Sequence, residues 1–95
     1  MSIKTLQVAQ TGSLVQVSAV AIRCKWAAFQ NNGAAVMRVG DANTTATRGQ
    51  SLAATGGAFS LPVSVSSTFG TDLSQWYTIG TSTQLLDVIY DDLNF

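Results

Sequence analysis

The sequence predicts a single all-β domain of about eight short strands, arranged as a sandwich or a barrel. The chain of 95 residues has the length of one domain. Valine, isoleucine, threonine and aromatic residues recur while glutamate is absent, a composition that favours strands over helices. Glycine and asparagine interrupt the chain about every ten residues, as in sandwiches or barrels of short strands. The pattern leaves open whether the strands close as a barrel or stack as two sheets.

The N-terminal part is predicted to be extended throughout. Residues 1–10 form a first strand or an extended arm, and residues 14–22 form one strand or a strand with a crossing loop. Residues 22–30 have the clearest strand pattern, because every second residue falls on one apolar face. That face carries Ile22, Cys24, Trp26 and Ala28.

The middle of the chain is predicted to begin with a hairpin. Asn31-Asn32-Gly33 indicates a tight turn, because asparagine and glycine accept positive φ angles at little cost. The returning strand covers residues 35–39. The remaining segments are a polar loop at 41–49, a short strand at 51–53 and a strand at 58–65, which Pro62 restricts to an edge or a bend.

The C-terminal part is predicted to form a second hairpin. A strand at 76–79 leads into a turn at 80–83 and a last strand at 85–90. The last strand places three apolar residues, Leu86, Val88 and Tyr90, on one face. A helical turn at 73–77, capped by Asp72, is the less favoured alternative for the segment before it. Residues 91–95 are expected to form an acidic extended arm.

The aromatic residues fall on opposite faces of their predicted strands. If Trp26 faces the core, Phe29 faces outward; if Tyr77 and Ile79 face the core, Trp76 faces outward. An outward aromatic residue on a surface with little charge is a suitable interface anchor. The alternative is a tryptophan that lies over the edge of the core.

The composition points to partners that cover part of the surface. Only 11% of the residues are charged and 46% are hydrophobic, whereas about a quarter of an average domain is charged. In the alternative interpretation, serine, threonine, asparagine and glutamine replace the charges on the surface. The net charge is zero and the basic residues are scattered, so no nucleic-acid partner is expected. No apolar run is long enough for a membrane span or a signal peptide, so synthesis in a cytosol and no membrane partner are expected.

The sequence offers little for catalysis or metal binding. It contains no histidine and one cysteine, Cys24, so it has no intrachain disulfide and no zinc site. Without histidine, a nucleophile lacks its usual base, and Cys24 is predicted to be a core residue. Asp91 and Asp92 are adjacent, but they are interpreted as a solubilising chain end, while Asp41 and Asp72 are interpreted as turn residues. We therefore expect no enzyme activity, no catalytic residues, no cofactor and no metal.

Three stretches resemble segments of small tailed-bacteriophage virion β-sandwich proteins, of the capsid decoration (cement) or head-fibre type. The likeness lies in turn glycines and strand periodicity and covers roughly residues 22 to 90. Trp76 departs from the pattern, since a small or polar residue is more usual there. The stretches are Asn31 to Asp41, Arg48 to Ala54 with Gly56-Gly57, and Leu73 to Gly80 followed by Leu86 to Tyr90.

The resemblance implies an antiparallel, jelly-roll-like β-sandwich. It also implies a structural protein of the virion that binds major capsid subunits on the capsid surface and stabilises the head shell. It also implies a homo-oligomer, with a trimer favoured, made in the host cytoplasm. The residues expected at interfaces, taken from the two predicted arms and the outward aromatic residues, are Ile3, Leu6, Phe29, Trp76, Leu93 and Phe95. The alternative hypothesis is a carbohydrate-binding or adhesive β-sandwich module, in which an exposed Trp76 would contact sugars.

Overall fold

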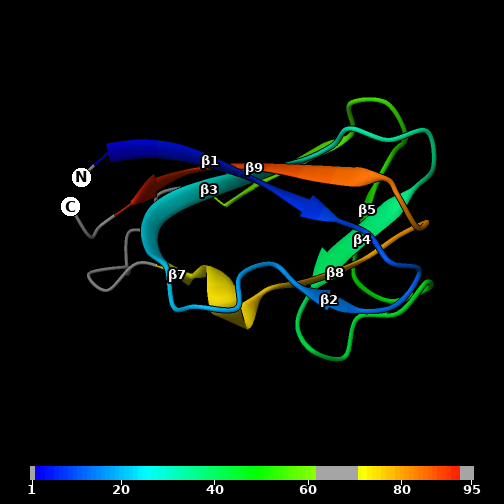
Figure 1. Ribbon diagram of the computed structural model, residues 1–95, viewed down its shortest axis with the longest axis horizontal. Helices are drawn as coiled ribbons and strands as arrows, with labels where there is room; N and C mark the ends of the chain where they lie inside the picture. Colours follow the sequence, from blue (N-terminus) through cyan, green and yellow to red (C-terminus); the bar gives the residue numbers. More distant parts are fainter. Residues whose placement is uncertain (1, 62–70, 93–95) are drawn as a thin grey trace.

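A computed structural model describes residues 2–61 and 71–92 and confirms the all-β fold. Two antiparallel sheets stack as separate layers, as Figure 1 shows, so the fold is a sandwich and not a barrel. The described strands are β1 (Ser2–Ala9), β2 (Val15–Gln16), β3 (Arg23–Asn31), β4 (Met37–Gly40), β5 (Gln50–Leu52), β6 (Ala58–Leu61), β7 (Thr71–Asp72), β8 (Tyr77–Ile79) and β9 (Leu85–Asp92). Within these residues the only helical segment is the 3-10 turn η1 (Leu73–Gln75).

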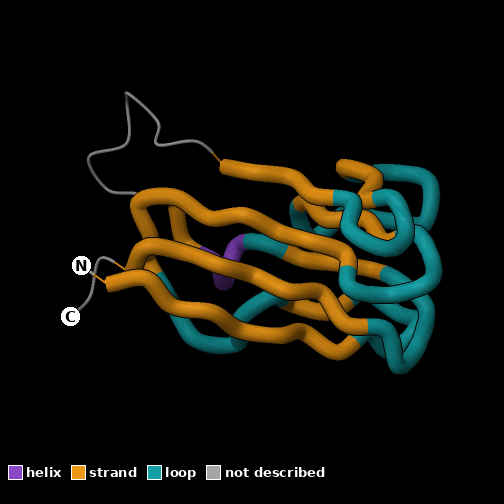
Figure 2. Tube along the Cα trace, turned by 90° about the horizontal axis from the view of Figure 1, so that it is seen from above, coloured by secondary structure: helices purple, strands orange, loops and turns teal. Residues whose placement is uncertain are grey.

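The strands are paired in a nested order. β1 pairs with β9, β2 with β8, β3 with β6 and β4 with β5, and every pair is antiparallel. The larger sheet has the order β1-β9-β3-β6, with β7 beside β3, and the smaller sheet has the order β2-β8-β4-β5. Successive pairs therefore alternate between the sheets, as in a jelly roll. Figure 2 shows the larger sheet face-on.

Both predicted hairpins are wrong. The turn at Asn31-Asn32-Gly33 connects β3 to β4, and residues 80–83 connect β8 to β9, but in each case the two strands belong to different sheets. These turns are crossings between the layers. Among the described strands, the one hairpin between successive strands is β4–β5, closed by the predicted polar loop, in which Gly49 has a φ of 120°. Local turn preference specifies a reversal but not the sheet that the next strand joins.

A buried asparagine fixes the crossing from β3 to β4. The Asn31 side chain is fully buried. Its Nδ2 donates to the carbonyl oxygens of Ala35 at 2.7 Å and Leu52 at 3.1 Å. Its Oδ1 accepts a hydrogen bond from the backbone N–H of Gly33 at 2.8 Å. One side chain thus forms hydrogen bonds with two backbone groups of the crossing and with the last residue of β5.

A register shift in β3 reverses the predicted alternation of its side chains. Cys24 lies opposite Asp92, and Ala27 lies opposite Tyr90, so β3 contains one more residue than β9 between these two pairs. This is a β-bulge, and it moves the following residues to the opposite face. Phe29 is fully buried while Trp26 is only half-buried. The predicted orientation of both aromatic residues is therefore wrong.

The core lies between the two sheets. The face of the last strand that carries Leu86, Val88 and Tyr90 is buried, as predicted, and so is Cys24. The buried hydrophobic residues are Val8, Val17, Cys24, Ala27, Phe29, Met37, Val39, Leu52, Leu73, Leu86, Val88 and Tyr90.

The chain ends take part in the sheet as far as they are described. β1 pairs with β9 without interruption from Ser2 to Ala9, so this segment is a strand and not a projecting arm. Asp91 and Asp92 are the last residues of β9, while residues 93–95 lie outside the described residues. The segment 14–22 contains only the short β2 followed by a loop, which matches the second of its two interpretations. Residues 62–65 of the strand predicted at 58–65 also lie outside the described ranges.

We predict that Asn31→Ala lowers the free energy of unfolding by about 3 kcal/mol, because it leaves two buried carbonyl groups and one N–H without their partner. Asn32→Ala is the matched control, since Asn32 is exposed and next in the chain. It should change the stability by less than about 0.5 kcal/mol. Urea denaturation measures both values, and equal effects for the two variants would contradict the role given to Asn31.

Candidate interaction surface

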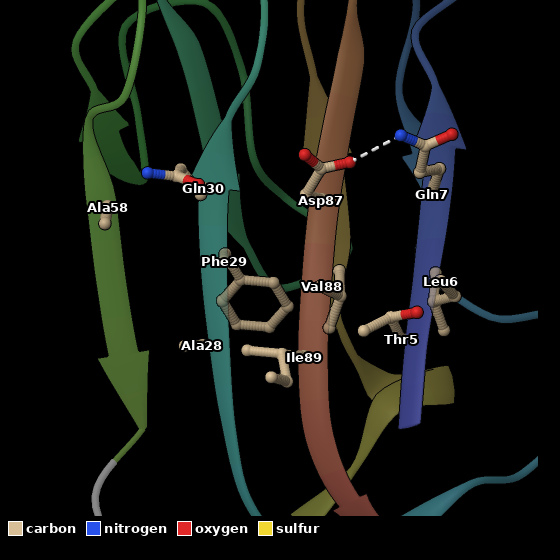
Figure 3. A pocket seen from close by; sticks show the side chains of 10 residues that line it. All are labelled: Thr5, Leu6, Gln7, Ala28, Phe29, Gln30, Ala58, Asp87, Val88 and Ile89. Atoms are coloured by element: carbon tan, nitrogen blue, oxygen red, sulfur yellow. Dashed lines mark hydrogen bonds between the residues drawn. The ribbon is translucent and has the colours of Figure 1, made fainter. Parts of the chain in front are cut away.

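The outer face of the larger sheet forms an open groove that runs across its strands. Figure 3 shows the groove with Ala28 and Ala58 on one side and the longer side chains of β9 and β1 on the other. Because the alanine side chains are short, the surface is hollowed over β3 and β6. Two rows of outward residues cross this face in register: Thr5, Ile89, Ala28 and Ser60 in one row, and Gln7, Asp87, Gln30 and Ala58 in the next.

The groove carries little charge. Among the described residues that line it, Asp87 is the only charged one. The Nε2 of Gln7 donates to Asp87 Oδ1 at 2.8 Å, so the carboxylate already has a hydrogen-bond donor from the neighbouring strand. Ile89 lies beside this pair and remains 40% exposed. A shallow, nearly neutral surface of this kind suits a protein partner, because covering it requires little desolvation of charge.

Apolar exposure continues from the groove toward the start of β1. Ile3 lies opposite Asp91, and Thr5 lies opposite Ile89, so Ile3 and Ile89 are diagonal neighbours on adjacent strands. Ile3 is 58% exposed. We refer to the groove together with Ile3 as the outer sheet face.

An ion pair joins β1 to β9 at the same end of the sheet. Lys4 Nζ lies 2.9 Å from Asp92 Oδ2, and the Asp92 side chain is largely buried. The hydrogen bond to Asp92, supported by the attraction of its negative charge, raises the pKa of Lys4. Asp92 is therefore an integral part of the sheet, and its interpretation as a solubilising chain end is wrong.

The structure separates the residues that the sequence predicted at interfaces. Ile3 is exposed on the outer sheet face, whereas Leu6 is half-buried and packs against the core. Phe29 is fully buried, so it cannot anchor an interface. Leu93 and Phe95 lie outside the described residues.

Trp76 belongs to an aromatic cluster. Its ring centroid lies 5.4 Å from that of Phe29 and 6.2 Å from that of Phe59, with tilted planes. The rings of Phe29 and Phe59 are stacked at 6.4 Å. The predicted outward orientation of Trp76 is wrong, and the alternative, a tryptophan over the edge of the core, describes it better because the side chain is half-buried.

The reason for this error is a buried threonine. Thr78 is fully buried, so Trp76, two residues earlier, also faces inward. The Thr78 hydroxyl accepts a hydrogen bond from Gln10 Nε2 at 2.8 Å and donates one to the carbonyl oxygen of Arg38 at 3.0 Å. A hydrophobic pattern assigns the inward face to Tyr77 and Ile79 instead, because it does not anticipate a satisfied polar group in the core.

A second, smaller hollow lies beside this cluster. It is lined by Gly40, Asp41, Gln75 and Trp76. Asp41 Oδ1 accepts the backbone N–H of Asn43 at 2.9 Å, which confirms its predicted role in a turn. The hollow thus combines an aromatic ring, a carboxylate and an amide.

The cysteine thiol and the Asp72 carboxyl, which could in principle act in catalysis, have structural roles. Burial raises the pKa of the fully buried Cys24 thiol to about 11, so it stays protonated at neutral pH. Hydrogen bonds from the backbone N–H and hydroxyl of Ser74, and from the N–H of Ile22, lower the pKa of Asp72, which caps η1. In the described ranges no three histidine, cysteine or acidic residues gather closely enough to hold a metal. No helix in those ranges is both long and apolar enough to cross a membrane.

Most of the outer sheet face does not follow from the local sequence pattern. The alternation in residues 85–90 already placed Asp87 and Ile89 on one side, which was the available signal. The neighbours that complete the face, Gln7 and Ala28, come from strands distant in sequence. Comparison with known proteins found no matching family model, curated protein or solved structure.

We predict that Trp76→Ala lowers the free energy of unfolding by about 3 kcal/mol, because it removes the ring that packs against both Phe29 and Phe59. Trp26→Ala is the matched control, since Trp26 is also half-buried but is not among the residues packed against the core cluster. It should cost about 1 kcal/mol or less. Denaturant titration followed by circular dichroism distinguishes the two, and a larger effect at Trp26 would contradict the assignment.

Proposed function

We propose that this protein is a capsid decoration (cement) protein of a tailed bacteriophage, which stabilises the head shell by binding major capsid subunits. The observation that carries the proposal is the outer sheet face, on which Ile3 and Ile89 are exposed and Asp87 is bonded to Gln7, with Asp91 opposite Ile3 at one end. The jelly-roll order of the strands adds support, since this architecture recurs among viral capsid domains. The fold also hosts other functions, so the surface bears most of the argument.

Binding would follow from burial of the exposed isoleucines. Each Å² of apolar surface removed from water contributes about 25 cal/mol. Asp87 opposes this burial only weakly, because Gln7 remains its hydrogen-bond partner when water leaves. A shell that repeats the same subunit offers many identical sites, and a clamp that touches two subunits must lose both contacts before the shell opens.

We predict that Ile89→Lys weakens binding to purified heads that lack this protein by about tenfold or more, because a charge then enters the covered surface. Val36→Lys is the matched control, since Val36 is also an exposed aliphatic residue but does not line the groove. Cosedimentation with heads measures both. Wild-type protein that does not cosediment with heads, or an unchanged affinity of Ile89→Lys, would reject the proposal.

The hollow beside Trp76 supports a second candidate function, a carbohydrate-binding or adhesive module. Sugar sites combine an aromatic ring with a few polar groups, and Trp76, Asp41 and Gln75 supply this combination. The packing of Trp76 against Phe29 leaves less of its ring for a sugar than an outward tryptophan would offer.

A glycan array with the wild-type protein and two glutamine variants tests this candidate. Gln75→Ala should abolish any glycan signal, whereas Gln30→Ala, an equally exposed change on the outer sheet face, should preserve it. Trp76→Ala is unsuitable because it alters the core. A wild-type protein that binds no glycan, or equal signals from both variants, would reject the candidate.

A further inference from the structure

The four described sheet edges differ greatly in length. β2 has two residues, β5 has three and the described part of β6 has four, whereas β1 has eight. An edge strand presents alternate N–H and C=O groups that have no partner in their own sheet. Among these edges, only β1 offers a long row of such groups.

β1 also lacks the usual features that prevent strand pairing. It contains no proline, and its register with β9 runs from Ser2 to Ala9 without a bulge. Lys4 is its only charged residue. That charge is already paired with Asp92 at 2.9 Å, so it repels another strand less than a free lysine would.

We propose that β1 pairs antiparallel with β1 of a second copy of this chain about a two-fold axis, joining the two larger sheets into one continuous sheet. The contact would make the proposed capsid-binding protein a two-fold symmetric dimer, but the contact itself does not depend on capsid binding. Its occupant is a second copy because β1 carries one charge, which an offset register keeps away from its symmetry mate, and because its side chains alternate between the two faces in the same way in both copies.

The side-chain pattern restricts the register. A two-fold axis perpendicular to the sheet keeps outward residues opposite outward residues. In β1 the outward residues have odd numbers and the inward residues even numbers. The two residue numbers of each facing pair therefore add to the same even sum, and this sum defines the register. A sum of eight places Lys4 against Lys4 and is unfavourable. Sums of ten and twelve avoid this clash and keep nearly the whole strand paired, with Thr5 opposite Thr5 or opposite Gln7.

The same contact cannot build larger rings from these edges. A two-fold contact uses β1 of both copies and leaves no further long edge in the described chain. A trimer through strand pairing would need β1 of one copy to meet a different long edge of the next. The net charge of zero also means that two copies approach without overall repulsion.

Analytical ultracentrifugation of the full chain, without capsids, tests the proposal. The wild-type protein should sediment with twice the 10.0 kDa mass of the chain across micromolar concentrations. The double variant Thr5→Lys with Gln7→Lys places lysines opposite lysines in both allowed registers and should be monomeric. Both positions are exposed, and circular dichroism checks that the variant is folded.

The matched control is Gln30→Lys with Ser60→Lys, which adds the same charge to the same outer face but away from the β1 edge. This control should remain dimeric. A wild-type protein that is monomeric or trimeric, a Thr5/Gln7 variant that stays dimeric, or a control that dissociates equally would each overturn the proposal.

Cysteine cross-linking provides an independent measurement. Thr5→Cys with Gln7→Cys should give a disulfide-linked dimer in either register, while Thr5→Cys alone should do so only when Thr5 faces Thr5. The native Cys24 is fully buried and should not contribute. Gln30→Cys is the control, and cross-linking of this variant to the same extent would overturn the proposal. Because no capsid is present, a failure here is distinct from a failure of the capsid-binding experiment.

Discussion

The pairing of β9 on both of its sides holds the larger sheet together. β9 meets β1 over eight residues and also pairs with β3, so the last strand of the chain joins the first strand to the middle. Its inward residues supply much of the core, and its outward residues Asp87 and Ile89 form the centre of the outer sheet face. The fold and the candidate surface therefore depend on the same contact, which joins residues far apart in the sequence.

Buried amide and hydroxyl side chains form hydrogen bonds with backbone groups where the chain crosses between the two sheets. Each crossing between the layers would leave backbone groups without partners inside the protein. Asn31 satisfies one crossing, and Thr78 with Gln10 links the end of β1 to β8 and β4. Part of the neutral polar composition is thus internal. The sequence alone suggested surface positions for these residue types, because composition does not reveal which of them find partners.

Local patterns predicted the strands well but not their arrangement. The all-β sandwich, the buried face of residues 86–90 and the turn role of Asp41 follow from alternation and residue type. The orientation of Phe29 does not, because one extra residue in β3 reverses the alternation before it. The groove does not either, since its rows combine β1, β9, β3 and β6, which are distant in the chain. The resemblance to phage virion proteins likewise rests on turns and periodicity and remains a proposal.

The short edges of this sandwich have a consequence for its colloidal behaviour. With only 11% charged residues and no net charge, the protein has little electrostatic repulsion to keep molecules apart at high concentration. The described parts of β2, β5 and β6, with two, three and four residues, offer few backbone groups to template a growing fibril, whereas the eight-residue edge β1 would be covered in the proposed two-fold contact. Pairing of β1 between two copies would thus take the place of charge as the safeguard against aggregation, in a chain whose composition alone would suggest poor solubility.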